Sequence, residues 1–347
     1  MAQPQPFLTT VIGSMPKRPW LFAPTTAIDG RRDHFAIAGT WSLQDESLKL
    51  AQDDATRIAL RDQERAGIDI VSDGEQRRKN YVTHLTAAMA GFDYESFEVR
   101  TIRAGRSTVR VGRCVGPIAH RGPILVDDLR FAMAETDRPV KVTLPGPMTV
   151  VDSTADAYYH DEKAMAFAWA DAINQEARLL DALGPAVIQF DEPVFSRYPE
   201  KTAEWGIEAL DRCVAGLSST TAVHVCYGYP QPGAPRPVRD TYATIIAELD
   251  RSKVDQLALE FEGPALDPRH LAACRSKTVL FGCVFNSDET HETAEHVARR
   301  LLAAADVLGP ERIQAAPDCG LVMMSPARAA EKLRIMVEGA RLARARV

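Results

Sequence analysis

His224 and Cys226 are separated by a single residue at the end of an apolar, β-branched run, in the stretch AVHVCYGYP. Alternate residues of an extended strand point to the same face, so these two side chains can bind one ion. Two further donors, Glu260 and Cys319, follow apolar runs of the same kind later in the chain. An imidazole, two thiolates and a carboxylate are ligands that a tetrahedral zinc ion accepts. The four residues therefore indicate a metal centre, although each of them alone is also typical of a packed or hydrogen-bonded core.

Eight apolar runs predict the strands that carry these donors. They begin at Thr9, Ile68, Val140, Ala186, Thr221, Gln256, Thr278 and Ile313. Most of them are continuously apolar, which is typical of strands buried on both faces of a parallel sheet. Between the runs lie stretches with apolar residues at three- and four-residue spacing, which indicate helices. This alternation predicts an α/β fold, a (β/α)8 TIM barrel built from right-handed parallel units.

In such a barrel the carboxyl ends of the strands form the catalytic face. The predicted strands end in polar residues, Gly or Pro, as at residues 73–75, 191–193 and 318–320. We therefore expect the ends of the fifth, sixth and eighth strands, which carry the four donors, to meet at one rim. The alternative architecture is a doubly wound open sheet with a small β lobe.

Two segments interrupt the alternation of strands and helices. Residues 17–45 contain Pro, Gly and Trp without periodicity, and residues 93–125 indicate a β-hairpin with Gly105 near its turn. We expect both the N-terminal loop and the hairpin to be insertions over the barrel mouth. Because no repeat or low-complexity linker divides the chain, residues 1–347 are predicted to form a single catalytic domain.

The composition limits the classes of partner. The chain has 347 residues, 46% of them hydrophobic, and a formal net charge of −6, which argues against a nucleic-acid surface. No apolar stretch is long enough to cross a bilayer and the N-terminus lacks a signal sequence, so we expect no membrane partner and a cytoplasmic protein. Six cysteines are too few for a disulfide scaffold in a chain of this length and are expected to be reduced thiols.

The order and spacing of several motifs resemble the cobalamin-independent methionine synthase family, in particular its C-terminal catalytic barrel. The matching stretches, which extend over nearly the whole chain, are TVIGS (10–14), DGE (73–75), LPGPMT (144–149), IQFDEP (188–193), HVCY (224–227), LE (259–260) and PDCGL (317–321). Full-length members have a second, N-terminal barrel, for which 347 residues leave no room. The chain therefore resembles a short form that lacks the N-terminal domain.

The resemblance implies transfer of a methyl group to the thiol of homocysteine, with zinc bound by His224, Cys226, Glu260 and Cys319. A free thiol with a pKa of about 8.5 is mostly protonated at neutral pH, and zinc lowers this pKa by holding the sulfur as its anion. Glu260 is the ligand expected to give up its place to the substrate, because a carboxylate is the hardest donor of the four.

The resemblance also implies the residues that bind the amino-acid part of homocysteine. Ile12, Gly13 and Ser14 match the segment that holds it, with the Ser14 hydroxyl and backbone N–H as donors. Glu75 and Asp191 match acidic residues that receive the substrate ammonium. The structural alternative for both acids is a helix N-cap or an ion pair at the barrel mouth.

The chain departs from the family on the donor side. Residues 152–154 (DST) replace a Trp that stacks on the folate ring, and Arg197 replaces an acidic folate contact. Arg113 and Cys114 still match a donor-side segment. The methyl donor is therefore left open between a methylated folate, a methylcorrinoid and a methyl group delivered by a partner protein.

The proton-transfer residue of the family is also missing. Its His after the seventh strand has no counterpart in the stretch VFNSDE, which leaves Asp288 or the nearby His291 as candidates. His291 lies close to a predicted helix start, where a solvent-facing role is the alternative.

Two other functions remain as hypotheses. One is zinc-dependent alkyl transfer to a different thiol, as in the related epoxyalkane:coenzyme M transferases. The other is a non-catalytic protein that binds a thiol or a metal and has lost the donor site. The presence of Ser14, Glu75 and Asp191 favours an amino-acid thiol such as homocysteine as the acceptor.

Overall fold

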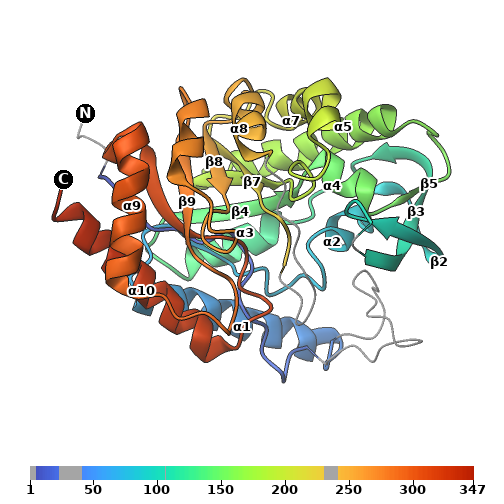
Figure 1. Cartoon of the computed structure of the whole chain (residues 1–347). Coiled ribbons are helices and arrows are strands. Elements are labelled where there is room, and N and C mark those ends of the chain that lie inside the picture. The colour runs from blue at the N-terminus through green and yellow to red at the C-terminus, as the bar shows by residue number, and fades with distance from the viewer. Residues whose placement is uncertain (1–4, 23–40, 106, 230–240) are drawn as a thin grey trace.

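The central element of the fold is a parallel sheet. The computed structural model describes residues 5–22, 41–105, 107–229 and 241–347 (Figure 1). Within these residues, seven strands form one curled sheet in the order β1-β4-β6-β7-β8-β9-β10, with all neighbours parallel. The strands are β1 (Val71–Ser72), β4 (Val140–Pro145), β6 (Val187–Asp191), β7 (Thr220–Val225), β8 (Gln256–Leu259), β9 (Thr278–Val284) and β10 (Ile313–Pro317). The predicted α/β class with a parallel sheet is confirmed.

Helices connect successive strands and lie around the sheet (Figure 1). The longer ones are α1 (Asp45–Ala66), α3 (Val126–Ala134), α5 (Glu162–Asp181), α7 (Ile207–Cys213), α8 (Tyr242–Asp250), α9 (Ala294–Leu308) and α10 (Pro326–Arg344). The shorter ones are α2 (Thr83–Thr86), α4 (Pro147–Asp152), α6 (Pro199–Lys201), the π-helical turn η1 (Thr202–Gly206) and the 3-10 turns η2 (Pro268–Ala273) and η3 (Pro310–Arg312).

Helix α5 illustrates how the sequence sets these elements. The Asp161 carboxylate caps its start by accepting hydrogen bonds from the backbone N–H groups of the second and third helical residues. Met165, Trp169 and Ile173, spaced four residues apart, are buried on one face. A helix with one apolar face packs that face on the sheet, and this is the periodicity that the sequence shows.

The N-terminal segment lies between the two edges of the sheet. Thr9 forms a parallel bridge with Ala315 of β10, and Thr10 forms one with Ile70, directly before β1. The Thr10 N–H donates to the Ala315 carbonyl oxygen at 3.0 Å, and the Ile70 N–H donates to the Thr9 carbonyl oxygen at 3.0 Å. The segment thus contacts the first and the last strand of the sheet at once.

The strand predicted from Thr9 onward forms these isolated bridges and no longer ladder. The cause is a pair of buried side chains that take the next backbone acceptors. Lys141 Nζ donates to the Val11 carbonyl oxygen at 2.9 Å, and Gln189 Nε2 donates to the Ile12 carbonyl oxygen at 2.7 Å. Side chains from inside the sheet therefore replace a neighbouring strand as hydrogen-bond partners of this segment.

A second, three-stranded sheet contains the predicted hairpin. β2 (Ala90–Ile102) and β3 (Ser107–Ala119) are antiparallel, and β5 (Ala155–Asp156) pairs parallel with β3. The hairpin begins before residue 93 and ends before residue 125, so it occupies most of the segment predicted as an insertion. Of the other predicted insertion, 17–45, residues 23–40 lie outside the described residues.

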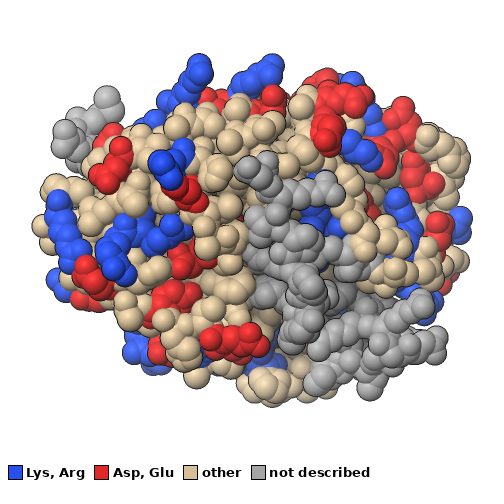
Figure 2. All heavy atoms as spheres, viewed as in Figure 1, with Lys and Arg blue, Asp and Glu red and all other residues tan. Residues whose placement is uncertain are grey.

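The surface carries charges of both signs. On the face shown in Figure 2, Lys and Arg side chains are interspersed with Asp and Glu side chains, with no large basic patch. Among the described helices, none is both long and apolar enough to cross a membrane.

Candidate active site

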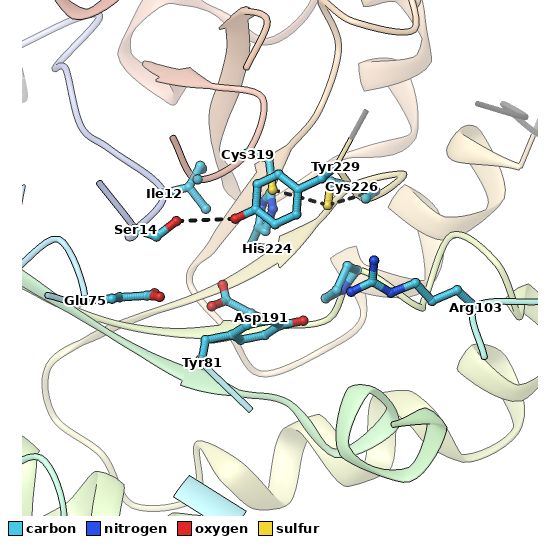
Figure 3. Close-up of a pocket in the computed structure, with 13 residues that line it drawn as sticks. Ile12, Ser14, Glu75, Tyr81, Arg103, Asp191, His224, Cys226, Tyr229 and Cys319 are labelled. Carbon is cyan, nitrogen blue, oxygen red and sulfur yellow. Dashed lines mark hydrogen bonds between the residues drawn. The ribbon is translucent and has the colours of Figure 1, made fainter. Parts of the chain in front are cut away.

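Three of the predicted metal ligands converge at the carboxyl end of the sheet. His224 lies in β7, Cys226 follows the last residue of β7, and Cys319 follows β10 by two residues (Figure 3). One donor atom from each lies within 4.8 Å of the others, and all three residues are buried. The Sγ atoms of Cys226 and Cys319 are 3.7 Å apart. Parallel packing of the strands is what brings together residues 93 positions apart in the chain.

The spacing of the two sulfurs fits a shared metal ion. Metal–sulfur bonds of about 2.3 Å at a tetrahedral angle place two thiolates about 3.8 Å apart. The two cysteines are free, and a disulfide would hold the sulfurs at about 2.0 Å. The hydrogen bond with Cys319, together with the nearby His224, lowers the pKa of the Cys226 thiol well below its ordinary value. The pair is therefore arranged to present at least one thiolate.

The imidazole of His224 is oriented as in a metal site. Its Nδ1 lies 3.1 Å from the backbone carbonyl oxygen of Ala258, which can only accept, so Nδ1 carries the proton. Its buried Nε2 has no hydrogen-bond partner among the described residues. A buried polar atom without a partner is costly, and a metal ligated by Nε2 would satisfy it.

The fourth predicted ligand occupies a different position. Glu260 is completely buried directly after β8. Its Oε2 accepts a hydrogen bond of 2.6 Å from the backbone N–H of Tyr227, the residue after Cys226. It does not belong to the cluster of three donor atoms that lie within 4.8 Å of one another. Its role as a ligand therefore stays a prediction.

The cluster opens onto a cavity whose empty space, counted out to the open solvent, is about 450 Å³. Its walls are formed by Ile12, Ser14, Glu75, Tyr81, Arg103, Asp191, Pro193, His224, Cys226, Gly228, Tyr229, Cys319 and Gly320. Ser14 and Glu75 approach it from one side in Figure 3, and Arg103 approaches from the other. The hydroxyl groups of Ser14 and Tyr229 are hydrogen-bonded at 3.3 Å. The cavity thus joins the His224, Cys226 and Cys319 cluster to four of the residues predicted to bind the amino acid.

Glu75 is held by neighbours that leave its carboxylate in the cavity wall. The Thr143 hydroxyl donates to Glu75 Oε1 at 2.8 Å, and the buried Arg78 lies 3.9 Å from the same oxygen. The backbone at Glu75 is left-handed, with φ of 55°, and its N–H donates to the Asp73 carboxylate at 2.9 Å. A non-glycine residue rarely adopts this conformation, so the turn is fixed by these contacts.

Asp191 is oriented by an amide that can face in only one direction. Lys141 Nζ donates to Gln189 Oε1 at 3.0 Å, and the Ile12 carbonyl oxygen, the other neighbour of this amide, can only accept. The Gln189 amide nitrogen therefore points the other way, to Asp191 Oδ1 at 2.8 Å and to the Ile12 carbonyl oxygen at 2.7 Å. Burial raises the pKa of Asp191 to about 7. A cation bound in the cavity would favour the ionised carboxylate and offset this shift.

The remaining predicted site residues lie outside the cavity wall. Arg113 and Cys114 belong to β3, where burial raises the pKa of the Cys114 thiol to about 11. Asp288 and His291 are exposed in the segment between β9 and α9, and Asp288 accepts a weak hydrogen bond from the Ser325 N–H at 3.4 Å. Their roles at the donor side and in proton transfer stay predictions.

Several residues of the cavity wall were not predicted from the sequence as site residues, among them three with long polar side chains. Tyr81, Arg103 and Tyr229 lie in connecting segments, not at the ends of predicted strands. Tyr229 is the one with a sequence signal, since it follows the His-x-Cys pair in the stretch HVCYGY. Arg197, which stands where the resemblance places an acidic folate contact, is buried, and its guanidinium donates to the Tyr227 carbonyl oxygen.

Comparison with known proteins identifies the family. Residues 7–342 match the model of the cobalamin-independent synthase catalytic domain. The chain belongs to this family. The resemblance predicted from the motifs is confirmed, and the chain is a methyltransferase of the cobalamin-independent methionine synthase type.

Relatives of this synthase family match over nearly their whole length. The methionine synthase of Sulfurisphaera tokodaii is 32% identical over 337 residues, which are 97% of this chain and 92% of the relative. That of Thermococcus kodakarensis is 30% identical over 339 residues, 97% of this chain and 93% of the relative. The solved structure of a B12-independent methionine synthase from a Shewanella species, in complex with selenomethionine, has a TM-score of 0.89, 33% identity and 98% coverage of both chains.

The close approach of the N-terminal segment to Glu75 gives a first prediction for this synthase. A Cβ atom at Gly13 would lie 2.8 Å from Glu75 Oε1 and from Thr143 Cγ2. We expect Gly13→Ala to displace the Glu75 carboxylate, to weaken homocysteine binding and to cost about 1–3 kcal/mol of unfolding free energy. Calorimetric titration and chemical denaturation measure the two effects. Gly116→Ala is the control, since its nearest neighbour lies 3.9 Å from the added Cβ, and wild-type behaviour of both variants would contradict the role of this contact.

Proposed function

We propose that the chain is a zinc-dependent methyltransferase that transfers a methyl group to the thiol of homocysteine and forms methionine. One observation supports the metal site. The Sγ atoms of Cys226 and Cys319 are 3.7 Å apart, beside the His224 Nε2, which has no hydrogen-bond partner among the described residues. Zinc bound there supplies a Lewis acid that keeps a substrate sulfur in its thiolate form. Soft thiolate and imidazole donors also suit zinc better than the harder divalent cations.

Glu260 is included in this proposal as the fourth ligand. Its support is complete burial after β8, next to β7, and its hydrogen bond to the amide that follows Cys226. A carboxylate is the hardest donor of the set, so Glu260 is the ligand that we expect to yield to the substrate sulfur. With two thiolates and one carboxylate, the ligands would carry three negative charges against two positive charges on zinc, which keeps a bound sulfur electron-rich.

The residues of the chain bind and orient the amino acid around this centre. Glu75 and Asp191, both in the cavity wall, receive the substrate ammonium. The segment of Ile12, Gly13 and Ser14 contacts the rest of the amino-acid group. Their placement beside the two sulfurs lets the thiol reach the cluster while the charged end stays at the acids. The complex of the Shewanella relative with selenomethionine supports an amino acid of this shape.

We further propose that the curled sheet closes into a (β/α)8 barrel and that residues 1–347 form a single domain. The bridges of Thr9 and Thr10 to opposite edges of the sheet support the N-terminal segment as the eighth strand. The β2–β3 hairpin would then be an insertion over the mouth, and its residue Arg103 in the cavity wall supports that position.

The function is tested by methionine formation. Zinc-loaded protein is incubated with homocysteine and a labelled methyl group on methyl-folate or methylcobalamin, each with and without a cell extract that can supply a donor protein. We expect labelled methionine with at least one donor. The acceptor 2-mercaptoethanesulfonate is the control for the alternative thiol chemistry. Alkylation of this control without methionine from any donor would contradict homocysteine as the acceptor.

A further inference from the structure

Arg103 supplies the single Lys or Arg side chain among the described residues of the cavity wall. It lies at the end of β2, in the turn of the hairpin. In Figure 3 its guanidinium points into the cavity from the side opposite Ser14 and Glu75, with Asp191 and Tyr81 between them. The wall therefore has Glu75 at one side, Asp191 in the middle and the cation Arg103 at the other side.

The turn that carries Arg103 is attached to the barrel. The Arg103 N–H donates to Asp152 Oδ2 at 2.9 Å, and the Ala104 N–H donates to the Tyr198 hydroxyl oxygen at 2.8 Å. The Tyr198 hydroxyl in turn donates to Asp152 Oδ1 at 3.0 Å. Arg103 and Ala104 are both left-handed, with φ of 55° and 53°, which non-glycine residues rarely adopt. The contacts to Asp152 and Tyr198 thus hold a turn that would otherwise be unfavourable.

This attachment also gives a structural role to one departure from the family. Asp152 belongs to the stretch DST that stands where the resemblance places an aromatic residue. It is the last residue of α4 and is largely enclosed, and burial raises its pKa. Asp152 therefore does more than replace an aromatic side chain that could stack on a ligand. It fixes the position of the turn that carries the cationic side chain of Arg103.

In the described part of the chain, Arg103 forms no ion pair within 4.0 Å, and the Asp152 carboxylate interacts with its charge only from a longer distance. The buried Arg78, by contrast, lies 3.9 Å from both Asp73 and Glu75. Asp191, the other acid of the wall, is hydrogen-bonded to Gln189. A guanidinium is charged at every physiological pH and its planar fork matches a carboxylate in two-point geometry. The cavity thus offers an incoming carboxylate a positioned partner.

We propose that Arg103 binds a carboxylate of a substrate at the mouth of the cavity, positioned by Asp152 and Tyr198. This inference rests on the proposed function. The carboxylate belongs either to the amino-acid acceptor or to the methyl donor, and both offer the same chemistry to the guanidinium. Arg103 is then a specificity-determining residue that selects substrates with an acid group at this position.

The acceptor is tested first by calorimetric titration of zinc-loaded protein, which needs no turnover. The ligands are L-homocysteine and 3-aminopropane-1-thiol, which keeps the thiol and the amine but lacks the carboxylate. If the acceptor supplies the carboxylate, Arg103→Gln weakens homocysteine binding at least tenfold and leaves the second ligand unchanged. Arg103→Lys, which keeps the charge without the fork, is expected to lie between wild type and Arg103→Gln.

The donor is tested with 5-methyltetrahydrofolate, which carries carboxylates, as the probe in the presence of homocysteine. If the donor supplies the carboxylate, Arg103→Gln leaves the affinity for homocysteine unchanged and weakens binding of 5-methyltetrahydrofolate at least tenfold. Arg110→Gln is the matched control, because it lies on β3 of the same hairpin with its guanidinium over the Phe97 ring, and it should change neither affinity.

The inference would be overturned if Arg103→Gln changed the affinity for homocysteine and the affinity for 5-methyltetrahydrofolate by less than twofold. A loss that is equal for homocysteine and 3-aminopropane-1-thiol would also overturn it, because the carboxylate would then not be involved. A failure of wild-type protein to form methionine would instead contradict the proposed function, since the binding measurements do not depend on catalysis.

Discussion

Replacement of Cys226 or Cys319 by serine is expected to remove the metal from the protein and to abolish methionine formation. A serine hydroxyl is neither ionised at neutral pH nor a soft donor, so each change removes a charged ligand from the cluster. Loss of an outer hydrogen-bond partner of a metal ligand already costs about 10- to 100-fold in affinity or activity, and loss of a ligand should cost more. The zinc content, measured by mass-spectrometric metal analysis, should fall from near one zinc per chain to near none.

Cys283→Ser is the matched control for these variants. Cys283 is another buried free cysteine, in β9, and its thiol donates to the Ala316 carbonyl oxygen at 3.5 Å. It lies outside the donor cluster, so the variant should keep its zinc and its activity. A chelator should inactivate the wild type reversibly, with recovery on added zinc. Full zinc content in both Cys226→Ser and Cys319→Ser would rule out the site.

The convergence of the three donors could be predicted from the sequence because strand order and direction determine it. His224 and Cys226 share a face through the two-residue period of a strand, and a parallel sheet places all carboxyl ends at one edge. Cys319 follows β10 by only two residues, so little chain is left to direct it elsewhere. The position of a side chain this close to the end of a strand is set by the position of the strand itself.

The order and direction of the strands determine the positions of Asp288 and His291 less directly. They follow the end of β9 by four residues or more, and they are not among the residues that line the cavity. Glu292 accepts a hydrogen bond from the Phe285 N–H at 2.9 Å and pairs with the buried Lys332 of α10 at 2.6 Å. These contacts link distant segments, and the periodicity of the sequence contains no information about them.

Arg103 was missed for a related reason. The hairpin could be predicted from its composition and from Gly105, but its orientation depends on Asp152 and Tyr198, which lie 49 and about 95 residues away in the chain. A turn with two left-handed non-glycine residues is also not signalled by any local pattern. The residues that complete the cavity therefore come from loops whose paths are set by tertiary contacts.

Glu75→Gln and Asp191→Asn are expected to weaken homocysteine binding by about 10- to 150-fold each without loss of zinc. Each change removes one charge-assisted hydrogen bond to the substrate ammonium, worth about 1.5–3 kcal/mol. Gln189→Leu should act in the same direction, because its amide is the group that points Asp191 Oδ1 into position. Calorimetric titration against homocysteine and metal analysis of the same samples measure the two quantities.

The ammonium role is separated from a structural one by 4-mercaptobutanoate, which has the thiol and the carboxylate of homocysteine but no amine. Binding of this ligand should be unchanged in Glu75→Gln and Asp191→Asn, because it has no ammonium group that could bind to the two carboxylates. Glu192→Gln is the control, since the Glu192 carboxylate accepts hydrogen bonds from the N–H groups of Met148 and Thr149 and should affect stability alone. An equal loss for both ligands would assign the two acids to the architecture of the barrel mouth, whereas a loss confined to homocysteine requires an amine between them.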